Sequence, residues 1–231
     1  MIHISNISKS YNRGEIKAVD SLCLHVQPGE IFGFLGPNGA GKTTTIKLIV
    51  GLLNPDSGNI IINGYDNQKQ PIEAKRSMGY VPDNPKVYDR LNGMEYLNFL
   101  ADVYEVPENV RKERIEFLLD GFSLTDAIYD PINTYSHGMK QKIVLIGALV
   151  HEPAVWILDE PMVGLDPRSS HFLKEYMREH CNRGNTVFFS THVLEVAEKL
   201  CDRIGIISEG RLIAIGTIDE LRRGEHAESL E

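Results

Sequence analysis

GPNGAGKT, residues 36–43, matches the pattern G-x-x-x-x-G-K-[ST] of a phosphate-binding loop, or P-loop. The apolar run IFGFL precedes it, and TTTIKLIVGLL follows with the spacing of a helix that Asn54 and Pro55 should end. A turn between a strand and a helix is the setting that this motif requires. A chance match occurs in roughly 1% of chains of this length. The sequence therefore predicts a P-loop nucleotide-binding fold.

The residue types of the loop explain how it would hold phosphate. Glycines let backbone N–H groups close around phosphate oxygens, and the N-terminus of the helix adds partial positive charge. We expect Lys42 to reach the β- and γ-phosphates, Thr43 to offer its hydroxyl to Mg²⁺ and Thr44 to contact the α-phosphate. The other loop residues expected to contact the nucleotide are Gly36, Asn38, Gly39, Ala40 and Gly41.

Two more apolar strands end in residues that suit nucleotide chemistry. VWILDEP (155–161) contains Asp159 and Glu160, and FFSTH (188–192) ends in His192. In α/β proteins the carboxyl ends of the strands carry the ligand. Asp159 would hold Mg²⁺ through water, Glu160 would be the base that orients an attacking water, and His192 would hydrogen-bond the γ-phosphate or that water. The structural alternatives are a buried strand that ends in two solvated acids, and a histidine with a purely structural role.

Strand–helix alternation over most of the chain predicts an α/β fold with a largely parallel sheet. The N-terminal strands predict an additional antiparallel part. From about Pro85 to Tyr135 the pattern indicates amphipathic helices and no strand. We therefore expect one domain of 1–231. Its parts would be a P-loop core formed by 1–82 and 141–222, an inserted helical lobe at 83–140, and a polar tail at 223–231.

The composition excludes some roles. The chain has 231 residues and a formal net charge of −8, which argues against a broad nucleic-acid interface. The N-terminus lacks the features of a signal peptide, and the longest apolar runs fall short of a membrane span, so any role at a membrane should come through a partner. Cys23, Cys181 and Cys201 form no CxxC pair, which indicates free thiols. The sequence contains no cluster of histidines and cysteines, so we expect no transition-metal site.

Six features, taken in order, resemble the ATP-binding subunit of an ABC transporter. They are the P-loop, the helical lobe, YSHGM at 135–139, ILDEP at 157–161, GLDP at 164–167 and STH at 190–192. YSHGM is similar to the signature segment of that family, GLDP to its D-loop, and STH to its switch histidine. The resemblance covers nearly the whole chain and implies an ATPase that uses ATP and Mg²⁺.

The resemblance also implies partners and a location. Two ATPase domains, in a homodimer or a heterodimer, would close head to tail over two ATP molecules, and hydrolysis would reopen them. These movements would drive separate transmembrane permease subunits, whose coupling helix the helical lobe would receive. The chain would be cytoplasmic and peripheral, on the inner face of the cell membrane. Further nucleotide contacts implied by the resemblance are Tyr11 against adenine, Ser136 and Gly138 of the signature segment, and Asp166 of the D-loop.

Two departures from the family pattern are evident. The family commonly has LSGGQ, so His137 and Met139 replace a glycine and a glutamine, while Ser136 and Gly138 remain. In GYVPDNP (79–85), Asp83 occupies the place of the usual glutamine. A carboxylate there would still serve Mg²⁺ through water, but it adds negative charge near a triphosphate. These variations resemble the branch that contains drug and peptide exporters.

Alternatives remain open for the signature segment and for the function. A nucleophile pair of Ser136 and His137 is disfavoured, because neighbouring residues at a turn rarely face each other and no acid orients the histidine, and a metal site lacks further ligands. Ser136 could instead cap the helix that MKQKIVLIGALV predicts, or contact the phosphate of a neighbouring subunit; free N–H groups at a helix start suit both of these roles. The competing functions are an ABC-type ATPase in DNA repair or translation, and a P-loop kinase or GTPase. The sequence lacks the long insertions, tandem domains or NKxD-type motif expected of these.

Overall fold

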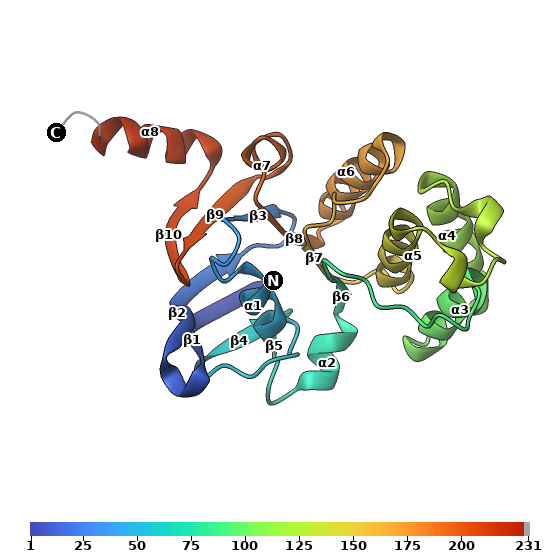
Figure 1. Ribbon diagram of the computed structural model, residues 1–231, viewed down its shortest axis with the longest axis horizontal. Coiled ribbons are helices and arrows are strands. Elements are labelled where there is room, and N and C mark those ends of the chain that lie inside the picture. The colour runs from blue at the N-terminus through green and yellow to red at the C-terminus, as the bar shows by residue number, and fades with distance from the viewer. Residues whose placement is uncertain (229–231) are drawn as a thin grey trace.

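The computed structural model describes residues 1–228, apart from the side chains of Arg13 and residues 224–228. Two sheets form the framework (Figure 1). The first is antiparallel, with the order β2-β1-β4-β5. Its strands are β1 (Ile2–Tyr11), β2 (Ile16–Val26), β4 (Ser57–Ile62) and β5 (Tyr65–Asp66).

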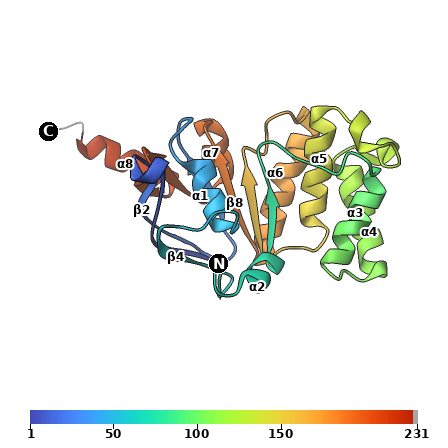
Figure 2. The same cartoon turned by 60° about the horizontal axis from the view of Figure 1, so that its bottom comes forward.

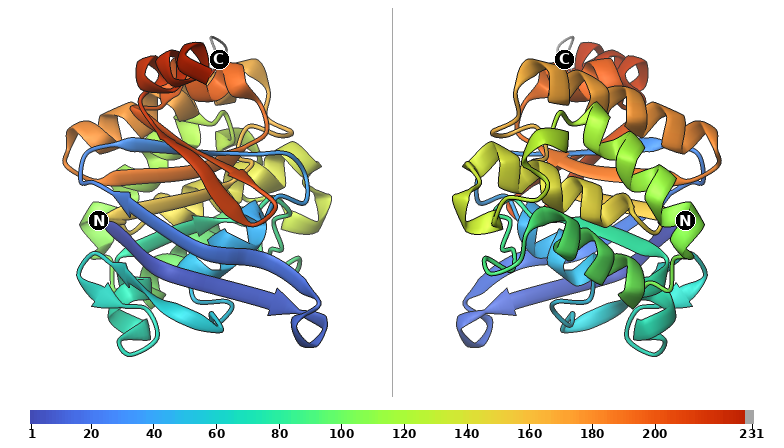
Figure 3. Two further views of the ribbon diagram at one scale, coloured as in Figure 1. Left: turned by 90° about the vertical axis from the view of Figure 1, so that its left-hand side faces the viewer. Right: turned by 90° about the vertical axis from the view of Figure 1, so that its right-hand side faces the viewer.

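The second sheet has six strands in the order β10-β9-β3-β8-β7-β6. All pairings are parallel except that of the edge strand β10 with β9. The strands are β3 (Ile31–Leu35), β6 (Met78–Val81), β7 (Val155–Asp159), β8 (Thr186–Thr191), β9 (Arg203–Ser208) and β10 (Arg211–Gly216). The left panel of Figure 3 shows the two sheets crossing at the edge where β2 approaches β10.

Helices pack on and between these sheets. They are α1 (Lys42–Ile49), α2 (Pro71–Arg76), α3 (Gly93–Val103), α4 (Glu108–Gly121), α5 (His137–Leu149), α6 (Pro167–Asn182), α7 (Leu194–Leu200) and α8 (Ile218–Glu228). Three short 3-10 turns are η1 (Asn12–Gly14), η2 (Thr125–Ala127) and η3 (Ile132–Thr134). Figure 2 shows α5 and α6 beside the parallel sheet and α3 and α4 farther out, in the helical lobe.

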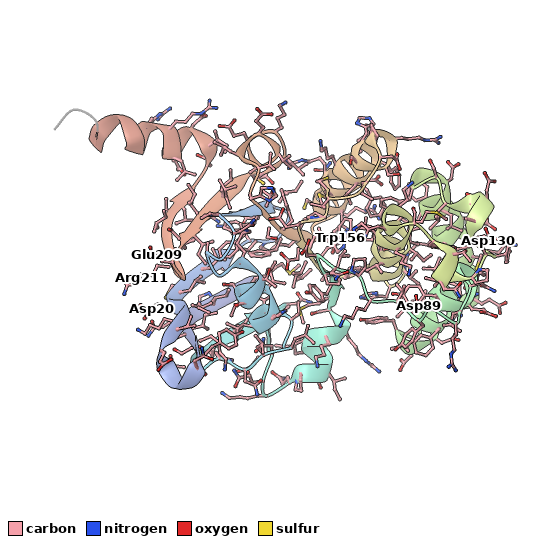
Figure 4. All side chains as sticks on the ribbon, in the orientation of Figure 1. Asp20, Asp89, Asp130, Trp156, Glu209 and Arg211 are labelled. Carbon is pink, nitrogen blue, oxygen red and sulfur yellow. The ribbon has the colours of Figure 1, made fainter. Side chains whose placement is uncertain are left out.

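The parallel sheet separates two hydrophobic cores because successive side chains of a strand point to opposite faces. On β7, Val155 and Ile157 enter the core shared with α1 and the antiparallel sheet. Trp156 and Leu158 enter the core shared with α5, α6 and the lobe. The ring of Trp156, labelled in Figure 4, lies 6.1 Å from that of Tyr176 on α6. This burial on both faces explains why the central strands are apolar throughout.

The first helix is shorter than predicted. It ends at Ile49, several residues before Asn54 and Pro55, and Gly51 follows in the left-handed conformation. The Asn67 side chain, buried beside it, donates to the carbonyl oxygens of Leu48 and Ile49. An amide from a distant segment therefore caps the last turn of α1.

The helical lobe is inserted between β6 and β7. Its first helix, α3, begins with a capping box, in which Asn92 accepts from the Glu95 N–H and Glu95 accepts from the Asn92 N–H. Within 83–140, all of it in the described part of the chain, there is no strand longer than an isolated bridge. The right panel of Figure 3 shows the lobe helices covering one face of the molecule.

The structure confirms the predicted fold class, an α/β P-loop core with a largely parallel sheet, an antiparallel N-terminal part and an inserted helical lobe. Helix α8 runs through the first residues of the predicted polar tail and projects from the body in Figure 1; residues 229–231 lie outside the described part. No helix among residues 1–228 is long and apolar enough to cross a membrane.

Candidate nucleotide site

The P-loop joins β3 to α1 at the carboxyl edge of the parallel sheet. Gly41 is the N-cap of α1 and has a φ of 108°. A Cβ atom there would lie 2.4 Å from the carbonyl oxygen of Ala18, so only glycine fits. No side chain caps the N-terminus of α1. Its first N–H groups therefore remain free to bind an anion.

The turn between β9 and β10 supports the P-loop from behind. The N–H of Gly210 donates to the Ala40 carbonyl at 2.9 Å, and the Gly210 carbonyl accepts from the Asp20 N–H at 2.9 Å. Arg211 donates to the Asp20 carboxylate at 2.9 and 2.7 Å, and the two residues lie side by side in Figure 4. Hydrogen bonds from Lys17 and Arg211 lower the pKa of Asp20 to about 2.

Lys42 lies inside the loop. Its side chain is 7% exposed, and Nζ donates to the carbonyl oxygens of Gly36 at 2.7 Å and Pro37 at 3.1 Å. Nζ also lies 3.7 Å from Oε1 of Glu160. The positive charge is thus held between the loop and the acid that follows β7.

The acidic residues at the end of β7 lie beside the polar end of β8, because Asp159 and Ser190 are register partners. Asp159 is buried, and its Oδ1 accepts a 2.6 Å hydrogen bond from Ser190 Oγ. The N–H of Glu160 donates to the same Ser190 Oγ at 3.1 Å. Glu160 Oε1 lies 3.0 Å from Nδ1 of His192. The structure therefore brings Lys42, Glu160 and His192 together.

A cavity of about 220 Å³ opens at this point. It is lined by Ala18, Asn38, Gly39, Gly41, Lys42, Thr43, Thr44, Asp83 and Glu160. Complete small-molecule pockets usually occupy about 300–1,000 Å³. One chain thus offers a groove of a size that suits phosphates, and the remainder of a nucleotide would lie outside it.

The residues around this cavity fit Mg²⁺. The Oδ2 atom of Asp159 is buried and has no hydrogen-bond partner in the described structure, and Thr43 presents an exposed hydroxyl. Burial raises the pKa of Tyr80 to about 12, and the negative charges of Asp159 and Asp83 add to this shift. Mg²⁺ prefers oxygen ligands and is commonly held by one or two carboxylates together with substrate phosphates. Among the described residues, no cluster of three acidic, histidine or cysteine side chains offers a metal site independent of the nucleotide.

The signature segment, residues 135–139, begins α5. Ser136 is its N-cap, and Ser136 Oγ accepts from the Met139 N–H at 3.2 Å, which confirms the predicted helix cap. A Cβ atom on Gly138 would lie 2.6 Å from the carbonyl oxygen of Gly164, so the segment packs on the D-loop of its own chain. Neither Ser136 nor Gly138 lines the phosphate cavity of the same chain.

Asp166 is the N-cap of α6. Its Oδ1 accepts from the Ser169 N–H at 2.9 Å, and its Oδ2 accepts from the Ser169 hydroxyl at 2.8 Å and lies 2.6 Å from Lys142 Nζ. The hydrogen bonds from Lys142 and Ser169 hold the pKa of Asp166 well below its usual range. Both carboxylate oxygens are thus engaged within the chain, and the expected nucleotide contact of Asp166 stays a prediction.

A family model described as ABC transporter matches residues 19–163. The chain belongs to this family. The linearmycin resistance ATP-binding protein LnrL of Bacillus subtilis (strain 168) is 42% identical over 221 residues, which are 96% of this chain and 70% of LnrL. This ABC transporter subunit is therefore an ATP-binding and ATP-hydrolysing domain.

Solved structures agree with that assignment. An ATP-binding subunit of an ABC transporter superposes on this subunit with a TM-score of 0.93 at 36% identity, covering 98% of this chain and 93% of that one. The cbiO1 protein from Clostridium perfringens, part of the ABC transporter complex cbiONQ, superposes with a TM-score of 0.81 at 26% identity, covering 98% and 92%. These similarities support neither a DNA-repair or translation ATPase nor a P-loop kinase or GTPase.

Tyr11 lies apart from the cavity of this ABC subunit. It ends β1, is 40% exposed, and is absent from the cavity lining, so its contact with adenine stays a prediction.

Two residues that contact the site residues directly were not predicted from the sequence. Ser190 was visible as a polar residue at a strand end, but its partner was not. Lys142 stood in an apolar helix, which is a signal for a buried charge with a partner.

Proposed function

We propose that this subunit hydrolyses Mg²⁺–ATP at a site completed by a second ATPase domain, and that the movements drive export through separate membrane subunits. The observation that supports this best is the single cavity lined by the P-loop, Asp83 and Glu160, with His192 hydrogen-bonded to Glu160. A phosphate-binding loop, a base and a polar partner of that base are the parts that phosphoryl transfer to water needs.

The binding roles follow from the positions of the loop residues. The backbone N–H groups of the loop and the first turn of α1 hold the β- and γ-phosphates, and Lys42 exchanges its carbonyl contacts for phosphate oxygens. Thr44 contacts the α-phosphate. The Thr43 hydroxyl would hold Mg²⁺ directly, and Asp159 and Asp83 would hold it through water. When bound, Mg²⁺ offsets the negative charge of the β- and γ-phosphates.

In the hydrolysis step, Glu160 orients a water molecule in line with the γ-phosphorus and accepts its proton as the new P–O bond forms and the bond to ADP breaks. His192 holds Glu160 Oε1 at 3.0 Å, which fixes the direction of the carboxylate. His192 is 50% exposed in its side chain, so it is also accessible to the γ-phosphate.

A second ATPase domain completes the site. The cavity of one chain is only about 220 Å³, and Ser136 lies outside it as the N-cap of α5. We infer that Ser136 and Gly138 of one subunit contact the ATP bound by the P-loop of the other, with Asp166 at the same interface. Adenine then rests against Tyr11. The sequence is compatible with a homodimer or a heterodimer.

The membrane subunits dock between the P-loop core (1–82 and 141–222) and the helical lobe (83–140). A largely apolar groove of about 370 Å³ lies there, lined in part by Leu52, Tyr80, Leu100, Tyr104 and His151. A coupling helix of a separate permease fits this groove, which agrees with the transporter complex that contains cbiO1. The resistance function in the name of LnrL supports export. With the permease docked in this way, the proposed position of the subunit is the cytoplasmic face of the membrane.

The docking proposal is tested by the membrane-bound fraction of the subunit in cells that contain its permease. Leu52 is 61% exposed and lines the groove, whereas Ile72 is 66% exposed and lies outside it. We expect Leu52→Glu to reduce the fraction on washed membranes several-fold and Ile72→Glu to leave it unchanged, while both purified variants hydrolyse ATP normally. Equal membrane binding of both variants would exclude this docking surface.

Asp83 is tested in the same assay system. Asp83→Gln, which installs the usual residue of the family, should retain hydrolysis. Asp83→Ala should reduce transport per ATP more than it weakens nucleotide binding. Unchanged transport per ATP in Asp83→Ala would contradict a coupling role.

A further inference from the structure

Ser190 lies at the end of β8 and is fully buried. Its hydroxyl makes two contacts with consecutive residues of the neighbouring strand end. It donates to Asp159 Oδ1 at 2.6 Å and accepts from the Glu160 N–H at 3.1 Å. A hydroxyl has one donor hydrogen, so the donor of Ser190 is committed to Asp159 and its lone pair to Glu160.

The contact with Asp159 decides which carboxylate oxygen is available. Oδ1 is held by Ser190, whereas Oδ2 is buried without a partner in the described structure. A carboxylate with one oxygen fixed cannot rotate freely about its Cβ–Cγ bond. The hydrogen bond therefore keeps Oδ2 in a constant position, as the carboxylate oxygen that would serve Mg²⁺.

The contact with Glu160 acts on the backbone. Glu160 has a φ of 49°, in the left-handed region that residues other than glycine seldom adopt. Such a conformation persists only where its surroundings hold it. The hydrogen bond from the Glu160 N–H to Ser190 Oγ is one such restraint. It helps to direct the Glu160 side chain toward Lys42 and His192.

We propose that Ser190 is a positioning residue that orients both the Mg²⁺-binding carboxylate of Asp159 and the base Glu160. This inference rests on the proposed function, because it assumes the roles given above to those two acids. One hydroxyl would then orient both the carboxylate that serves the metal and the base that directs the attacking water. Threonine retains the hydroxyl, whereas alanine removes it.

The experiment compares Ser190→Ala, Ser190→Thr and the control Thr186→Val. Thr186 lies on the same strand, is fully buried, and donates to the Gln27 carbonyl at 2.9 Å, away from the site. We expect Ser190→Ala to lower kcat about 10–100-fold, as loss of an outer-sphere hydrogen bond to a metal ligand does. Ser190→Thr should restore most of this loss, and Thr186→Val should keep wild-type kcat.

A second readout separates positioning from a general loss of structure. ATP affinity is measured by calorimetry in a Glu160→Gln background, once with Mg²⁺ and once with EDTA. Ser190→Ala should reduce the gain in affinity that Mg²⁺ provides and leave the affinity in EDTA unchanged. Thermal unfolding verifies that each variant is folded. If Ser190→Thr does not fold, the comparison of Ser190→Ala with Thr186→Val still tests the positioning role.

Three results would contradict the proposal or the function on which it rests. If wild-type protein hydrolyses ATP with Mg²⁺ and Ser190→Ala matches it in kcat and in Mg²⁺-dependent affinity, Ser190 has no positioning role. If Thr186→Val loses as much as Ser190→Ala, the effect is structural and the proposal is wrong. If wild-type protein shows no Mg²⁺-dependent hydrolysis, the proposed function fails, and this inference fails with it.

Discussion

Lys142 Nζ lies 2.6 Å from Asp166 Oδ2, and this ion pair joins the second turn of α5 to the N-cap of α6. Lys142 is buried, and the same carboxylate caps α6. Nearby, Gly138 packs on the carbonyl of Gly164. The signature segment and the D-loop of one chain are thus held together and should move as one unit when two ATPase domains close.

Asp166→Ala should lower the free energy of unfolding by about 1–2 kcal/mol, because it removes the cap of α6 and the partner of a buried lysine. Asp166→Asn keeps a cap acceptor and should lose less. The folded pKa of Asp166 is depressed, so its contribution is present at pH 7 and is lost only as the pH falls below the usual carboxyl range. Urea unfolding at pH 7 measures this. The control is Arg168→Ala, an exposed position in the same turn; an equal effect of both variants would contradict the assignment.

Lys42→Ala should remove most of the affinity for Mg²⁺–ATP, because the ammonium held in the loop lines the cavity that is expected to hold the phosphates. A loss of about 100-fold corresponds to a charge-assisted contact of roughly 3 kcal/mol. Calorimetric titration is the measurement. Lys47→Ala, an exposed lysine on the same helix, serves as the control and should bind like wild type. Unchanged binding by Lys42→Ala would refute the nucleotide site.

Glu160→Gln should slow hydrolysis by two to four orders of magnitude, about the contribution of a general base. The amide keeps the shape of the side chain but loses the basic oxygen, so ATP still binds. Closed dimers should then accumulate with ATP, which size-exclusion chromatography with light scattering detects. Hydrolysis at the wild-type rate would show that another group activates the water.

The trans role of Ser136 is tested by mixing two inactive proteins. Lys42→Ala and Ser136→Arg each break both sites of a homodimer. In a mixed dimer with sites completed in trans, one site receives both lesions and the other receives none. Random mixing should restore about a quarter of the wild-type activity, if the two sites act independently.

A cis arrangement gives a different result, since every site then keeps one lesion and mixing restores nothing. Mixed dimers must first be shown to form and to hold ATP. Because Ser136 also caps α5, Asn133→Arg at an exposed position nearby controls for the bulk of arginine. It should remain active alone.

Acid should destabilise the fold through two histidines, the fully buried His180 and the half-buried His151. Burial lowers the pKa of His151 and His180 from 6.5 to about 4. Between pH 6.5 and 4 the unfolded chain therefore binds more protons than the folded one, so the free energy of unfolding falls as the pH falls. The loss down to pH 4 is on the order of 3 kcal/mol for each group.

His180→Phe keeps an aromatic ring beside Trp156 and Tyr176 but cannot be protonated. Urea unfolding between pH 4 and 7 should show a smaller loss of stability for this variant than for wild type. His171→Gln, at an exposed histidine, should retain the wild-type dependence. Identical pH dependence of all three proteins would mean that His180 titrates normally in the folded state.

Local sequence determined which residues are candidates for the nucleotide chemistry. The P-loop, the acids after VWIL and the histidine after FFST each depend on a short pattern, a strand followed by particular side chains. Such patterns act within a few residues of the chain, and parallel strands place their carboxyl ends at one edge of a sheet. Lys42, Glu160 and His192 could therefore be predicted to meet.

Tertiary structure alone decided what supports these residues. Ser190 meets Asp159 only because β7 and β8 are neighbours in that register, and Lys142 meets Asp166 only because α5 packs beside α6. Asn67 ends α1 across a separation that no local pattern reveals. The reason is physical: a buried polar group requires a partner, but which distant segment supplies it depends on strand order and packing.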